Sequence, residues 1–130
     1  MPYMVMNHDV DPREAINAEI GDISNVEIFN NQVLCAIYIR PEKTKSGLYL
    51  TDQNRDEDKI QGKVGLIVKM GSEAFVDGND QWFNDVIFNV NDWVVFRPSD
   101  GWSVTVNGVL CRIIDDINIR GRIQQPDQVW

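Results

Sequence analysis

The chain has 130 residues, which is enough for one domain with a modest hydrophobic core of its own. Its 12 basic and 20 acidic residues give a formal net charge of −8. This negative charge repels phosphate backbones and anionic lipid headgroups, which argues against nucleic-acid binding and against a role at a membrane surface.

Two further global features bear on location. No apolar run approaches the roughly 20 residues that cross a bilayer, and the first residues lack the charged and apolar regions of a secretory signal. We therefore expect the protein in the cytoplasm, or in a particle assembled there.

Cys35 and Cys111 both fall in apolar stretches, so we expect reduced core cysteines rather than a disulfide.

A short helix is predicted near the N-terminus. Residues 11–14, Asp-Pro-Arg-Glu, place an N-cap aspartate before a proline at the first helical position, with an acid three residues after the cap. Apolar residues from Ala15 to Ile20 form a stripe, and Gly21 is a suitable stop. A helix of this length is not stable alone, so we expect it to pack against something.

Six apolar or alternating stretches predict β-strands, at residues 33–39, 63–70, 93–96, 103–106, 109–113 and 117–123. Asn107-Gly108 predicts a tight hairpin between the fourth and fifth, because a type I′ turn needs a positive φ at both central residues. Many short strands and one short helix predict a mainly β fold, a small barrel or sandwich.

Two long connections interrupt this pattern, at residues 43–61 and 71–91. Loops of that length are uncommon unless they have a function, so we expect the function there. Residues 44–61 are polar almost throughout, apart from the triplet Leu48, Tyr49 and Leu50. The triplet fits either a short edge strand that folds back onto the barrel, or an exposed anchor that becomes ordered when it docks into a partner's groove.

The sequence offers no arrangement of catalytic residues. His8 is the only histidine and has no cysteine or serine motif around it, so we expect an exposed, inert side chain. The acidic stretches 56–58 and 77–80 match no metal-binding spacing and are interpreted as solvated turns. Asp115-Asp116 is interpreted as a turn former rather than a pair of catalytic carboxylates. We therefore expect no enzyme, no metal and no cofactor.

Three stretches, in this order along the chain, resemble the co-chaperonin (GroES-like) family. Residues 33–52, VLCAIYIRPEKTKSGLYLTD, resemble its first strand and mobile loop. Residues 61–71, QGKVGLIVKMG, resemble its returning strand, and residues 90–119, VNDWVVFRPSDGWSVTVNGVLCRIIDDINI, resemble its later strands and closing segment. The resemblance implies a small GroES-like β-barrel with two long loops over residues 33–123. A 32-residue extension (1–32) with the short helix precedes it, and a tail (124–130) follows.

The resemblance also assigns roles to the two loops. Residues 44–61 correspond to the mobile loop, and Ser46 and Gly47 precede the chaperonin-contacting triplet Leu48, Tyr49 and Leu50. Residues 72–90 take the place of the hairpin that roofs the ring, with three aromatic residues, Phe75, Trp82 and Phe83. The family forms seven-membered rings that cap an ATP-driven chaperonin ring around an unfolded substrate, and it has no catalytic residues or cofactor.

Both terminal extensions depart from the usual family pattern. Such extended relatives occur in bacteriophage genomes, and virion proteins use terminal arms to clasp their neighbours. Two functions therefore stay open. The first is a phage-type co-chaperonin in the cytoplasm. The second is a bacteriophage virion structural protein on the same fold, a capsid decoration or head–tail component whose partners are phage capsid proteins. Both imply a homo-oligomer that acts through protein contacts.

Overall fold

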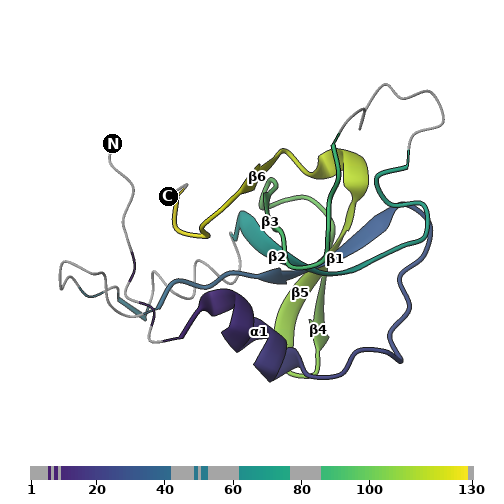
Figure 1. Cartoon of the computed structure of the whole chain (residues 1–130). Coiled ribbons are helices and arrows are strands. Elements are labelled where there is room, and N and C mark those ends of the chain that lie inside the picture. The colour runs from purple at the N-terminus through teal and green to yellow at the C-terminus, as the bar shows by residue number, and fades with distance from the viewer. Residues whose placement is uncertain are drawn as a thin grey trace.

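The computed structural model describes residues 6, 8, 10–41, 49, 51–52, 62–76 and 86–128 (Figure 1). In this part of the chain there is one α-helix, α1 (Pro12–Ile20). The strands are β1 (Gln32–Ile37), β2 (Val64–Met70), β3 (Trp93–Val95), β4 (Trp102–Val106), β5 (Val109–Asp115) and β6 (Gly121–Ile123), and a short 3-10 helix, η1 (Asp116–Asn118), precedes β6.

The strands form one antiparallel sheet in the order β4-β5-β1-β2-β3-β6. The first strand in the sequence, β1, lies in the interior of the sheet between β5 and β2. The predicted hairpin joins β4 to β5, and Asn107 and Gly108 both have positive φ, at 50° and 84°. The predicted mainly β fold with one short helix is confirmed.

The helix follows the predicted cap chemistry. The Asp11 carboxylate accepts a hydrogen bond of 2.9 Å from the Arg13 backbone N–H, and Gly21 ends the helix with a φ of 65°. The side chain of Ile20 is buried in the core, so α1 packs on the sheet of its own chain. Among the described residues, no helix combines the length and hydrophobicity that a membrane span requires.

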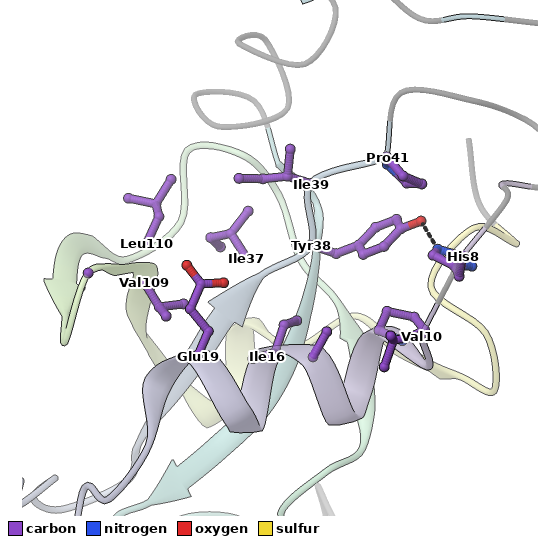
Figure 2. A pocket seen from close by; sticks show the side chains of 13 residues that line it. His8, Val10, Ile16, Glu19, Ile37, Tyr38, Ile39, Pro41, Val109 and Leu110 are labelled. Atoms are coloured by element: carbon purple, nitrogen blue, oxygen red, sulfur yellow. Dashed lines mark hydrogen bonds between the residues drawn. The ribbon is translucent and has the colours of Figure 1, made fainter.

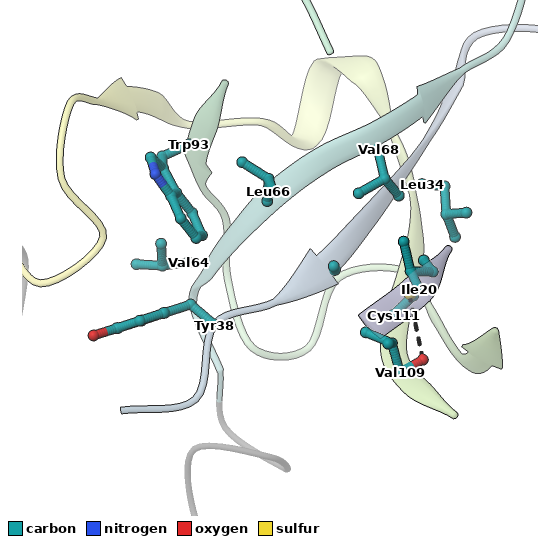
Figure 3. Packing of buried hydrophobic residues seen from close by; sticks show 10 residues of the cluster. Ile20, Leu34, Tyr38, Val64, Leu66, Val68, Trp93, Val109 and Cys111 are labelled. Carbon is teal, nitrogen blue, oxygen red and sulfur yellow. Dashed lines mark hydrogen bonds between the residues drawn. The ribbon is translucent and has the colours of Figure 1, made fainter. Parts of the chain in front are cut away.

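Alternate residues of β1 belong to two different hydrophobic clusters, because successive side chains of a strand point to opposite faces. Leu34 and Ala36 lie in the first cluster, whereas Val33, Cys35 and Ile37 lie in the second. The first cluster, with Tyr38, Leu66 and Trp93 among its members, also receives Ile20 from the helix (Figure 3). Burial on both faces explains why β1 and β2 are almost continuously apolar in sequence.

The predicted strand 117–123 is wrong in its first half. Residues 116–118 form η1 instead, and the Ile119 backbone N–H donates to the Asp116 carbonyl oxygen at 3.2 Å. The reason is the Asp116 side chain, which is buried and hydrogen-bonded to two other segments and so holds the chain in a turn. Only Gly121–Ile123 pairs as a strand, with β3.

Both cysteines are buried free thiols, as predicted. Cys35 belongs to the second cluster and Cys111 to the first, so the two side chains lie on opposite faces of neighbouring strands. Burial raises the pKa of Cys111 to about 11, and it raises the pKa of Cys35 further. Few thiolates therefore form at neutral pH.

We expect both thiols to resist iodoacetamide in the native protein at pH 8 and to react rapidly in urea, which mass spectrometry of the alkylated chain would reveal. The raised pKa values also set a pH dependence, because the unfolded chain loses its thiol protons first as the pH rises. The free energy of unfolding should fall above about pH 9, the ordinary thiol pKa. Rapid alkylation of either cysteine without denaturant would contradict the burial.

Candidate functional site

The predicted contact triplet is only partly described by the structure. Tyr49 is 70% exposed, so the described part of the chain leaves most of this residue uncovered. Ser46, Gly47, Leu48 and Leu50 lie outside the described residues. Around the triplet, the structure therefore describes the residues at the two ends of the 44–61 segment and the surfaces beside these ends.

The chain leaves the sheet at a firmly held point. Beyond the end of β1, the Tyr38 backbone N–H still donates to the Val64 carbonyl oxygen at 2.9 Å. The buried Tyr38 ring packs edge-on against Trp93, with 5.7 Å between ring centroids, and its hydroxyl shares a 2.7 Å hydrogen bond with His8 Nε2. His8 is half-buried in this contact, so the expectation of an exposed histidine is wrong.

The chain returns to the sheet at a second fixed point, Gly62, which is buried. Its carbonyl oxygen accepts a hydrogen bond of 3.3 Å from Arg112 Nη1, which also donates to the Pro98 carbonyl oxygen. The Arg112 side chain is buried, and its guanidinium lies over the Phe96 ring. Burial lowers the pKa of Arg112, and the negative charge of Asp100 opposes that shift. No signal in the sequence predicted this buried cation.

A largely apolar groove of about 570 Å³ lies beside the departure point (Figure 2). Residues of α1 form one wall, the end of β1 forms another, and the β4–β5 turn closes one end. The apolar lining includes Val10, Ile16, Ile39, Pro41 and Leu110. The groove thus joins the N-terminal helix to the residues from which the 44–61 segment departs.

The two ends of the 72–90 segment are held together by aromatic packing. Phe75 stacks on Phe88 with 4.1 Å between ring centroids, and both pack against the second core cluster. The Arg122 guanidinium lies 5.0 Å from the centroid of Phe88. Trp82 and Phe83 lie outside the described residues. The exposed apolar side chains at these ends are others, chiefly Ile87, which is 74% exposed.

Asp116 holds the first end of the 72–90 segment in place through Phe75. The residue is only 3% exposed, and its carboxylate accepts hydrogen bonds from the Phe75 backbone N–H at 2.9 Å and from Asn31 Nδ2 at 3.0 Å. Asp115 has a different partner, the side-chain amide of Gln32, at 3.3 Å. The two carboxylates therefore accept hydrogen bonds from different residues, and both act as structural supports. In sequence, nothing distinguishes Asp116 from a solvated turn residue.

No group of acidic, histidine or cysteine side chains suited to a metal ion occurs within the described residues. The acidic stretches 56–58 and 77–80 lie outside them. The candidate site therefore consists of the 44–61 and 72–90 segments, the supports at their ends, and the apolar groove. This arrangement suits contact with another protein.

A comparison with protein families gives a match that covers most of the chain. The family model described as "Chaperonin 10 Kd subunit" matches residues 25–123. The matched region contains all six strands of the described sheet, whereas α1 precedes it. No curated protein matches the chain.

Proposed function

The chain belongs to the chaperonin 10 kDa subunit family, and from that premise we propose that it caps a chaperonin ring in the cytoplasm through residues 44–61. Members of this family are co-chaperonin subunits and not enzymes; they act as oligomers together with a chaperonin. In the proposed mechanism, Leu48, Tyr49 and Leu50 insert into an apolar groove on the chaperonin. On the family resemblance, we also propose a ring of seven copies.

The observation that carries the proposal is the exposed Tyr49 on a segment with two fixed ends. Tyr38 holds one end against β2, and Arg112 holds Gly62 at the other. An aromatic side chain that is 70% exposed gains apolar contacts when a partner covers it. Each such contact is weak alone, so the proposal relies on several copies that bind one ring together.

The 72–90 segment has a second role in this proposal, as the roof of the ring. Phe75 supports the base of the segment through its contacts with Phe88 and Asp116. We propose that Trp82 and Phe83 contribute to the roof itself. The exposed side chain of Ile87 lies at the end of the same segment and would line the surface beside them.

The virion alternative has less support, because it requires the terminal segments to clasp neighbouring proteins. In this structure α1 packs on its own sheet. The Met6 backbone N–H also donates to the buried carboxylate of Asp127 at 2.8 Å, so the two terminal segments bind each other. Such contacts within one chain leave less of either segment available for a neighbour.

The central test replaces two anchors, Leu48→Asp together with Leu50→Asp, in the full chain. We expect binding to a chaperonin ring in the presence of ADP to weaken by at least about 100-fold, because each buried leucine contributes about 1.5–3 kcal/mol. Surface plasmon resonance on immobilised chaperonin would measure this affinity.

Ile117→Asp is the matched control, since it places an aspartate at another exposed apolar position, on η1. Its affinity should stay within about twofold of the unmodified protein. Circular dichroism must show the same fold for all variants. If the double variant still binds the ring and supports refolding of a substrate, the proposed role of the triplet is wrong.

A further inference from the structure

A second hollow, of about 550 Å³, lies between the first turn of α1 and the β3–β6 edge of the sheet, and its lining is mostly polar. Arg13 reaches it from the helix and Arg122 from β6. Gln124 and Gln125, just after β6, and Asp92, just before β3, complete the polar lining. We call this hollow the arginine pocket. Its lining shares no residue with the apolar groove or with the 44–61 and 72–90 segments, although Arg122 and Asp92 contact the end of the 72–90 segment.

Arg13 has an unusual hydrogen-bonding state. Its Nε atom is buried, and it has no hydrogen-bond partner in the described part of the chain. The helix cap does not use the guanidinium, because Asp11 accepts its bond from the Arg13 backbone N–H. A buried donor without an acceptor costs about 1–3 kcal/mol, so native proteins rarely keep one. An acceptor supplied by a ligand would remove that cost.

The charges in the pocket do not balance. Among the described residues, two arginines line it but only one acidic residue, Asp92. Asp92 Oδ2 accepts a bond of 2.9 Å from the Asn89 backbone N–H and lies 3.4 Å from Arg122 Nη1, which itself also donates to the Ile87 carbonyl oxygen. The described lining therefore carries one positive charge more than negative, in a protein whose net charge is −8.

The two glutamines are held in place by the turn that follows β6. The backbone N–H groups of Gln124 and Gln125 both donate to Gln128 Oε1, at 3.0 and 2.7 Å. This leaves the side-chain amides of Gln124 and Gln125 at the lining, where each can donate to an oxygen atom. The pocket thus combines two arginine side chains with two neutral side-chain amides that can donate hydrogen bonds.

We propose that the arginine pocket binds a small oxyanion that carries carboxylate or phosphate groups. A planar guanidinium donates two parallel hydrogen bonds to such groups, and Arg13 Nε is a donor that the described residues leave unused. The volume exceeds that of a single phosphate group, so a ligand with more than one anionic group fits. This site does not depend on the proposed co-chaperonin activity.

The test uses citrate and inorganic phosphate as probes, with the full chain at low ionic strength. We expect saturable binding of at least one probe by calorimetry, with NMR shifts concentrated on the Gln124 and Gln125 side-chain amides and the Trp93 indole. Arg13→Gln should weaken that binding by at least about tenfold, the effect of losing one charge-assisted hydrogen bond. Arg122→Gln supplies an independent variant with the same expected direction.

Arg97→Gln is the matched control, because Arg97 is 63% exposed, lies outside the pocket lining and carries the same charge. It should change the affinity by less than about twofold. Arg13→Lys keeps the charge but lacks the Nε donor, so it should also bind more weakly. The proposal is overturned if neither probe binds with a dissociation constant below about 10 mM. It is also overturned if Arg97→Gln weakens binding as much as Arg13→Gln.

Discussion

Replacing Gly71 with alanine should lower the free energy of unfolding by about 3 kcal/mol. A Cβ atom at this position would overlap with the Asn30 carbonyl oxygen and would lie 2.8 Å from that of Phe29. Both contacts are with backbone atoms, so no side-chain rotation can relieve them. The backbone cannot move freely either, because the Gly71 N–H donates to the Gln32 carbonyl oxygen at 2.8 Å.

Urea unfolding followed by tryptophan fluorescence would measure this loss, at one fixed protein concentration because the stability of an oligomer depends on it. Gly121→Ala is the matched control. No described atom lies within 4 Å of a Cβ built there, and its φ is not positive, so the change should stay within about 0.5 kcal/mol. An unchanged unfolding midpoint for Gly71→Ala would refute the close approach.

Asp116→Ala should be almost as damaging, with a loss of about 3 kcal/mol, because it removes a buried acceptor from the partly buried donors of Phe75 and Asn31. Asp115→Ala is the matched neighbour. It removes a single long bond to Gln32 from a partly exposed residue and should cost less than about 1 kcal/mol.

Hydrogen exchange provides a second, local measurement of the Asp116 contact. The Phe75 amide should exchange faster in Asp116→Ala than in Asp115→Ala, since only the first variant removes its acceptor. Asp116→Asn should fall between Asp116→Ala and the unmodified protein, because an amide oxygen still accepts one bond. Equal effects of Asp115→Ala and Asp116→Ala on stability and exchange would contradict the role assigned to Asp116.

These two predictions concern the same corner of the molecule. The turn at residues 29–31 touches Gly71, donates to Asp116 through Asn31, and accepts the Glu73 backbone N–H at Asn30. The first end of the 72–90 segment is therefore fixed by three different kinds of contact. Weakening this corner should loosen the proposed roof segment while leaving the 44–61 segment, which is anchored elsewhere, unchanged.

Local chemistry made much of the fold predictable. The helix ends follow from Asp11 and Gly21, and the β4–β5 turn follows from Asn107-Gly108, because each signal depends only on adjacent residues. The position of β1 between β5 and β2 could not be predicted in this way. Strand pairing depends on segments far apart in the chain, and several orders satisfy the same hydrophobic pattern.

The candidate site also had parts that the sequence predicted and parts that depend on the fold. The two long connections were visible in the sequence as interruptions of the strand pattern, and so was the apolar triplet within the polar 44–61 segment. Their supports were not visible. Arg112 is a charged residue in an apolar strand, and Asp116 has the sequence context of a turn; only the fold shows that both are buried against backbone donors or acceptors. The arginine pocket likewise draws on residues 13, 92 and 122, which share no sequence motif.

The central position of β1 also determines when the sheet can form during synthesis. Gln32 and its partner Asp115 are 83 positions apart, and Met6 and Asp127 are 121 apart. At a synthesis rate of about 5–20 residues per second, β1 emerges roughly 4–17 seconds before β5 can pair with it. During that interval one side of β1 has no neighbouring strand, so the sheet can be completed only after β5 has been synthesised.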